Sequence, residues 1–182
     1  MNQVQPRRRH CDAIAKLSLI GVFSLAALGC VQRAKPGPVR PLTPQAAAEA
    51  RRTIVAWLEC EECTDGELAA VKKLGSIAVP TLAATLREGP PPANLETLRR
   101  HLAKTYQKLK EYERTHPESK VSDEATYVRQ NVDAYVSLYK SRAATGLGAI
   151  GGSDAKRALQ DAAAAPHDDV VKSAINEALG KL

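Results

Sequence analysis

A short phrase of small and apolar residues occurs three times in this chain. Each copy leads to Leu-Gly, then one further residue, then Ile or Leu. The copies run from Leu68 to Ile77, from Arg142 to Ile150 and from Ala174 to Leu182. Their apolar residues have helical spacing, and glycine readily adopts the left-handed conformation in which many helices end. The phrase therefore predicts a helix that stops at the glycine of each copy, with the following apolar residue tucked beneath the helix end.

The spacing of the copies indicates helical pairs. Leu147 and Leu179 are 32 residues apart, close to one helical-pair repeat, and Leu74 and Leu147 are 73 apart, which fits two such units with extra length inserted. No segment shows the strict alternation of apolar and polar residues typical of a strand. Alanine is abundant and aromatic residues make up only 4% of the chain, which suits thin, closely packed helices. We therefore predict an all-α fold.

Helix start and stop signals divide the second part of the chain. Thr43 can cap a helix that has Pro44 at its first position, and Thr64-Asp65-Gly66-Glu67 has the spacing of a capping box. Proline-rich and glycine-rich stretches separate the later helices. The expected helices run over about 44–62, 64–75, 79–88, 94–114, 123–147, 154–164 and 168–179.

The stretch from Arg142 to Leu182 resembles HEAT-like repeats of the phycobilisome-lyase type. The residues that carry the resemblance are Leu147-Gly148-Ala149-Ile150-Gly151, Ala158-Leu159, Asp168-Asp169-Val170-Val171-Lys172 and Ala178-Leu179. Residues 66–89 resemble such repeats less closely, and 94–139 hardly do. The resemblance implies a short solenoid of antiparallel helix pairs over residues 45–182, with an inserted pair of long helices. It also implies partner binding, since nothing in the chain supports bilin chemistry.

The first thirty residues have the three parts of an export signal. Basic residues lead into an apolar run from Leu17 to Leu28, and the run closes with Ala26-Ala27-Leu28-Gly29-Cys30. The run is about a dozen residues long, whereas a membrane-spanning helix needs roughly 20. The cysteine after small residues resembles the lipobox of bacterial lipoprotein signals. The alternative is an ordinary secretory signal in which Cys30 is incidental.

The lipobox resemblance implies removal of residues 1–29 and acylation of Cys30, with palmitate among the chains. Val31 follows the cysteine in place of the aspartate that resembles an inner-membrane retention mark, so we expect an anchor on the periplasmic side of the outer membrane. Residues 30–44 contain four prolines within nine residues, which is typical of an extended tether.

The charge of the chain argues against a nucleic-acid partner. The whole chain carries a formal charge of +6, but residues 1–29 hold four of the basic residues and Asp12, so the excess without them is +3. A nucleic-acid-binding domain has a much stronger basic footprint.

Cys60 and Cys63 form the only Cys-x-x-Cys of the sequence. An exported pair at i and i+3 can form a disulfide, because the Cα atoms at this spacing lie about 5 Å apart. A redox pair favours a helix N-terminus, whereas this pair follows a predicted helix among three glutamates, which raise a thiol pKa. A structural disulfide is the preferred interpretation. Unlinked thiols and redox or metal chemistry are the alternatives.

The predicted helix over 94–114 has two faces. An apolar stripe on one face is expected to be buried: Leu95, Leu98, Leu102, Leu109 and Tyr112. A basic row on the other face is a possible binding surface for acidic proteins, lipid headgroups or lipopolysaccharide: Arg99, Arg100, Lys104, Lys108 and Arg114. A solvated helix face is the simpler interpretation. Tyr127, Tyr135 and Tyr139 fall on one face of the next helix, and we expect them at the edge of the core.

No catalytic constellation stands out. Gly146 to Gly151 matches GxGxxG, but no strand precedes it and the repeated phrase already explains its glycines. We therefore expect no enzyme activity, cofactor, metal or small-molecule substrate. The sequence favours a lipid-anchored envelope scaffold that binds another protein. The rivals are a thiol-redox factor using Cys60 and Cys63, and a lipid or lipopolysaccharide binder using the basic row.

Overall fold

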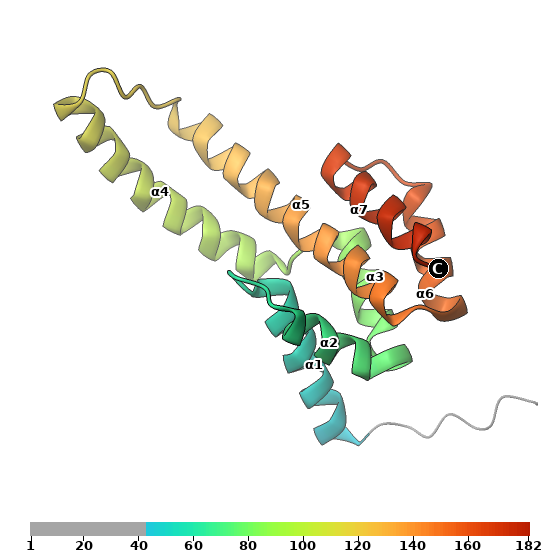
Figure 1. Ribbon diagram of the computed structural model, residues 1–182. Coiled ribbons are helices and arrows are strands. Elements are labelled where there is room, and N and C mark those ends of the chain that lie inside the picture. The colour runs from blue at the N-terminus through green and yellow to red at the C-terminus, as the bar shows by residue number, and fades with distance from the viewer. Residues whose placement is uncertain (1–42) are drawn as a thin grey trace, which may run out of the picture. The chain divides into compact units, whose positions relative to one another are not determined.

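The structure is a computed structural model that describes residues 43–182. The expected export signal, Cys30 and the tether up to residue 42 lie outside the described residues. The described chain folds into helices joined by short connections (Figure 1). These are α1 (Pro44–Glu59), α2 (Asp65–Leu74), the 3₁₀ turn η1 (Gly75–Ile77), α3 (Val79–Glu88), α4 (Pro92–Thr115), α5 (Glu124–Ile150), α6 (Gly152–Ala163) and α7 (Asp169–Gly180). The prediction of an all-α fold is confirmed for residues 43–182.

The helix starts follow from local side-chain chemistry. The Thr43 hydroxyl accepts a hydrogen bond from the Ala46 N–H at 3.2 Å, and Thr64 and Glu67 form the expected capping box. Asp123 and Asp168 cap α5 and α7 by accepting backbone N–H groups at 2.9 Å. These caps satisfy N–H groups that the first helical turn leaves without intrahelical partners, which is why the sequence alone locates them.

Two helix ends differ from their prediction. α1 ends at Glu59 and not near 62, so Cys60 is its C-terminal cap and Cys63 lies beyond the helix. α5 passes through Gly148 to Ile150, and Gly151, with a φ of 71°, ends it. Of the three phrase glycines only Gly75, with a φ of 57°, follows its helix in a left-handed conformation. The three copies of the phrase are therefore not structurally equivalent.

Gly148 serves close packing between α5 and α7. A Cβ atom added at Gly148 would lie 2.8 Å from the Cβ and 3.0 Å from the Cα of Ala178. Such an approach is possible only where one helix has no side chain. The glycine that the sequence placed at a helix end instead lets two helices touch.

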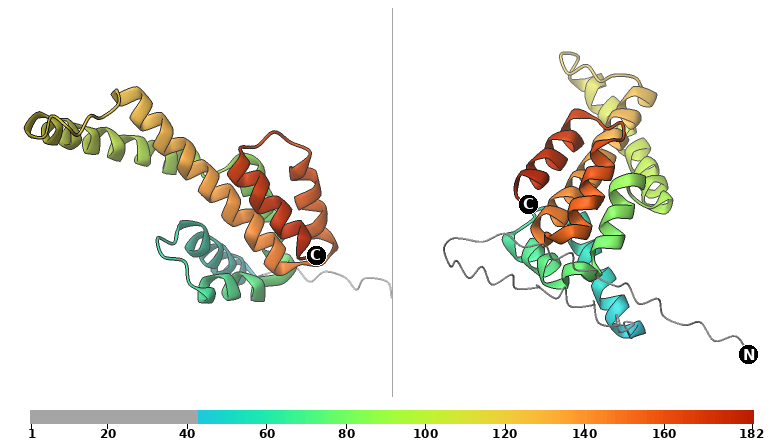
Figure 2. Two further views of the ribbon diagram at one scale, coloured as in Figure 1. Left: turned by 45° about the horizontal axis from the view of Figure 1, so that its top comes forward. Right: turned by 90° about the vertical axis from the view of Figure 1, so that its right-hand side faces the viewer.

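α5 is the central helix of the described residues. It packs against α7, α3, α2, α6 and α1 through its second half, and against α4 through its first half (Figures 1 and 2). Large side chains from six helices are fully buried in this core: Ile54, Val71, Leu82, Leu86, Leu147, Leu159, Val171 and Ile175. The second half of α5 therefore has neighbours on most sides, whereas its first half has chiefly α4.

α4 and α5 form a long antiparallel hairpin. In both views of Figure 2 the far part of this hairpin has no other helix beside it. Leu102, Tyr106 and Val132 are buried between the two helices, outside the main core cluster. Within residues 43–182, no helix is both long and apolar enough to cross a membrane.

Candidate functional site

A groove opens where the end of α1 meets the hairpin of α4 and α5. Its volume is about 590 Å³. Residues from all three segments line it: Glu59, Cys60 and Glu61 at the end of α1 and just after it, Asn94, Thr97, Leu98 and His101 from α4, and Tyr135, Leu138 and Arg142 from α5. The groove thus combines apolar side chains with groups of both charges.

The disulfide lies at the α1 end of this groove. Cys60 and Cys63 are joined by a disulfide bond, with their Cα atoms 5.2 Å apart. The bond closes the turn that follows α1, and Cys60 itself lines the groove. Cys60 is the C-terminal cap of α1, where no positive dipole lowers a thiol pKa, whereas Cys63 directly precedes Thr64, the N-terminal cap of α2. The geometry suits a bond that holds the end of α1 in place.

Glu59 links α1 to both helices of the hairpin. Its Oε1 atom accepts a hydrogen bond from Asn94 Nδ2 at 2.6 Å and another from the Tyr139 hydroxyl at 3.3 Å. Burial raises the pKa of Tyr139 well above its usual range, and the nearby negative charge of Glu59 raises it further. Tyr139 therefore stays a neutral hydrogen-bond donor, and Glu59 is already engaged before any ligand enters.

Arg142 is the cation of the groove. One guanidinium nitrogen, Nη1, donates to the Leu58 carbonyl at 2.9 Å, and the Arg142 carbonyl accepts from Trp57 Nε1 at 3.0 Å. These two bonds fix Arg142 against α1. Arg142 is half-buried and forms no ion pair within residues 43–182. Because a guanidinium carries five N–H donors, most of its donors remain for a ligand.

The apolar wall of the groove includes an unusually exposed leucine. Leu138 is 45% exposed although it lies on the central helix, and half-buried Leu98 and Tyr135 lie beside it in the groove. The Tyr135 ring packs at 5.6 Å from the Tyr139 ring. A groove with an apolar wall and few placed polar groups is typical of binding sites.

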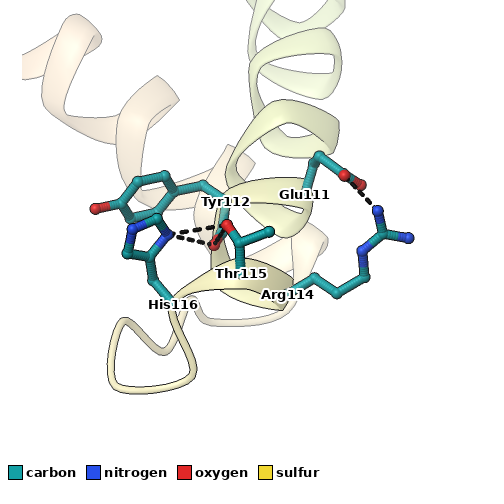
Figure 3. Close-up of polar contacts among 5 residues, drawn as sticks. All are labelled: Glu111, Tyr112, Arg114, Thr115 and His116. Carbon is teal, nitrogen blue, oxygen red and sulfur yellow. Dashed lines mark hydrogen bonds and ion pairs between the residues drawn. The ribbon is translucent and has the colours of Figure 1, made fainter.

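The basic row does not behave as one surface. All five of its side chains are exposed. Arg100 pairs with Glu96 at 3.9 Å, and Arg114 pairs with Glu111 near the end of α4 (Figure 3). Arg99, Lys104 and Lys108 form no ion pair among residues 43–182.

The apolar stripe of α4 is only partly as expected. Leu102 is buried and Leu95, Leu98 and Leu109 are half-buried, but Tyr112 is 53% exposed. Tyr106, absent from the predicted stripe, is buried instead. Its hydroxyl donates to the Ser122 carbonyl at 3.0 Å and its ring lies 5.7 Å from that of Tyr127.

Tyr112 is exposed because it lies in the last turns of α4, where α5 has barely begun. There its ring stacks on His116 at 4.0 Å between centroids (Figure 3). The Thr115 hydroxyl and His116 Nδ1 both lie within hydrogen-bonding distance of the Tyr112 carbonyl, at 3.0 and 3.2 Å. These groups complete the end of the helix and do not face the groove.

Sequence reasoning found Cys60 but missed Arg142, Leu138 and Asn94. One signal was available: Tyr135, Leu138 and Arg142 are spaced i, i+3 and i+7, which places them on one helix face. No feature of the neighbouring sequence indicates that this helix face is exposed to solvent. Among residues 43–182, no three His, Cys, Asp or Glu side chains are grouped to hold a metal ion.

In comparisons with protein-family models, with curated proteins and with solved structures, nothing matches this chain.

Proposed function

We propose that this protein is a lipid-anchored scaffold of the cell envelope, built from HEAT-like helix pairs, that binds a protein partner in the groove between the end of α1 and the hairpin of α4 and α5. The lipobox-like segment ending at Cys30 supports the anchor, with the outer membrane as its expected place. The antiparallel pair α6 and α7, in the stretch that resembles a HEAT-like repeat, supports the fold. In this proposal the hairpin of α4 and α5 is an insertion among the helix pairs and determines which partner binds.

One observation carries the binding function. Leu138 is 45% exposed beside Arg142, whose guanidinium has no carboxylate partner within the described residues. Exposed leucine costs hydrophobic free energy, and a half-buried cation without a counter-ion adds to that cost. Both costs are relieved when a partner covers the groove with apolar and acidic groups. In this proposal the Cys60–Cys63 bond holds the end of α1 and has no redox role.

The test is cross-linking in cells followed by affinity purification. We expect one envelope protein to be recovered with the native chain and lost with Leu138→Glu, because a charge is placed in the apolar wall. Val170→Glu is the matched control, since Val170 is 62% exposed on α7, away from the groove. Both substituted positions are exposed, so we expect thermal melts to show that both variants are folded. Recovery of the same protein with Leu138→Glu would contradict the groove, and recovery of none would contradict the scaffold.

The anchor has its own test. We expect Cys30→Ala to release the protein from the membrane fraction, because the variant has no thiol to acylate. Retention of the variant in that fraction would contradict lipid anchoring. It would not contradict partner binding in the groove.

A further inference from the structure

The charged side chains of the groove are not paired with one another. The lining holds one cation, Arg142, and two carboxylates, Glu59 and Glu61. His101 also lines the groove and is counted as neutral at pH 7. Neither carboxylate forms an ion pair with Arg142 or with another cation of residues 43–182. The lining therefore has one negative charge in excess, and it presents groups of both signs that have no counter-ion.

The two carboxylates differ in what they already bind. Glu59 Oε1 accepts hydrogen bonds from Asn94 Nδ2 at 2.6 Å and from the Tyr139 hydroxyl at 3.3 Å, so this side chain holds α1 to the hairpin. Glu61 follows Cys60 in the turn between α1 and α2, and its side chain is exposed. Glu61 is therefore the carboxylate of the lining that a ligand can reach without breaking the contacts of Glu59.

The cation of the lining stands beside an exposed leucine. Leu138 precedes Arg142 by one helical turn, so the two side chains lie on the same side of α5. The guanidinium is fixed by its 2.9 Å bond to the Leu58 carbonyl, and most of its other donors remain for a ligand. The groove thus offers a fixed cation on α5, an apolar wall that includes Leu98 and Leu138, and an exposed carboxylate after α1.

We propose that the partner segment bound in the groove carries charges of both signs: a carboxylate that meets Arg142, and a lysine or arginine that meets Glu61. This inference rests on the proposed function and names the chemistry of the partner. A guanidinium binds a carboxylate through two parallel hydrogen bonds. A long basic side chain packs its aliphatic stem on apolar surface and keeps its charged head at the rim. A segment with charges of one sign would be repelled by either Arg142 or Glu61.

The probes are four fluorescein-labelled synthetic peptides that share two central leucines and differ only in the residues on either side of them. Two peptides are mixed, with arginine before and aspartate after the leucines or the reverse. The other two carry arginine on both sides or aspartate on both sides. Fluorescence anisotropy measures binding to the unlipidated Cys30→Ala chain. We expect one mixed peptide to bind about two- to fivefold more tightly than both single-sign peptides, since each of those replaces an attractive pair by a repulsive one.

Charge reversal at the rim tests the contact with Glu61. We expect Glu61→Lys to weaken the preferred mixed peptide about two- to fivefold and to strengthen the peptide with two aspartates. Glu62→Lys is the matched control, because it makes the same charge change at the next exposed residue of the same turn, which does not line the groove. At about 0.15 M salt, where the Debye length is about 8 Å, this control should leave both affinities unchanged. The gain with the aspartate peptide cannot arise from a variant that has failed to fold.

The outcomes separate this inference from the scaffold proposal. Equal binding of the four peptides, tightest binding of a single-sign peptide, or an equal effect of Glu61→Lys and Glu62→Lys would overturn the inference. Binding of none of the peptides would also overturn it, and the scaffold would stand if the cellular partner is still lost with Leu138→Glu. Binding to phosphatidylethanolamine vesicles that is lost with Glu61→Lys, with no peptide bound and no cellular partner, would make the groove a lipid-headgroup site and overturn both.

Discussion

At the residue scale, Gly148 shows how one missing side chain sets the distance between two helices. It lies in the last turn of α5, and within a helix alanine is intrinsically the better helix former by about 1 kcal/mol. The backbone of Ala178 nevertheless lies only 3.0 Å from the place that a Cβ would occupy. For Gly148→Ala, the steric contact with Ala178 therefore predicts a loss of stability, whereas helix propensity predicts a gain.

We expect Gly148→Ala to lower the free energy of unfolding by about 1–3 kcal/mol, because the new methyl group meets Ala178 backbone atoms that cannot rotate away. Urea unfolding measures the change. The control is Gly180→Ala at the last residue of α7, where a Cβ meets nothing within 4 Å and φ is not positive. That variant should be unchanged or slightly more stable. Equal effects of the two substitutions would contradict the close approach.

At the scale of elements, Asp168 joins the start of α7 to the side of α5. Its carboxylate accepts the Val171 N–H at 2.9 Å and the Ser137 hydroxyl at 2.7 Å. Partial burial by itself would raise the pKa of Asp168, but these hydrogen bonds outweigh it, and the pKa lies below its ordinary value of 3.8. One side chain thus caps a helix and ties it to its neighbour.

A pKa lowered by folding makes stability depend on pH in a fixed direction. The contribution of the Asp168 charge is complete above pH 3.8, the ordinary value, and is lost as pH falls through the lower value of the folded state. Asp168→Asn keeps a capping oxygen for Val171 but removes the charge. We expect it to cost about 0.5 kcal/mol at pH 7, with the difference from the native chain disappearing near pH 2. Urea unfolding at several pH values checks this.

The matched control is Asp169→Asn, which removes an exposed carboxylate from the next position without touching the cap. The change in unfolding free energy caused by Asp169→Asn should be the same with or without the Ser137 hydroxyl. Ser137→Ala should instead reduce the pH-dependent part of the cost of Asp168→Asn. If Asp168→Asn costs the same at pH 2 as at pH 7, the charge contributes nothing through these bonds.

Element starts were predictable from the sequence because their causes are local. Thr43, Thr64, Asp123 and Asp168 act on N–H groups two or three residues away, so a short window contains the whole interaction. Gly148 could not be placed this way. Its role depends on Ala178, which is thirty residues distant in the chain. A glycine that ends a helix and one that admits a neighbouring helix look the same in sequence.

The groove was less predictable than the helix starts, because it depends on contacts between residues that are distant in the chain. Arg142 was assigned to a repeated helix phrase, and only the fold shows that its guanidinium meets the Leu58 carbonyl and the end of α1. The basic row was predicted as a set of five residues. Glu96 and Glu111 pair with Arg100 and Arg114, whereas Arg99, Lys104 and Lys108 form no ion pair among residues 43–182. None of the five basic residues lines the groove.

At the scale of the whole described chain, packing is unevenly distributed along α5. Near Ala143 and Leu147 the helix is fully buried among α2, α3, α6 and α7. Toward its start it has α4 alone, and the two helices bury only a few side chains between them, among them Tyr106 and Val132. Segments with few buried apolar contacts open at lower free energy than the core.

Hydrogen exchange should reveal this gradient within one continuous helix. We expect the slowest amides of α5 near Leu147 and faster exchange over 124–132 and 106–115, because the far hairpin can separate without disturbing the core. Uniform protection along α5 would contradict this division. The gradient also connects stability with the proposed function, since a partner bound in the groove adds a neighbour to the hairpin. Binding of the partner in the groove should therefore slow exchange in α4 and in the part of α5 that lines the groove, and leave the amides near Leu147 unchanged.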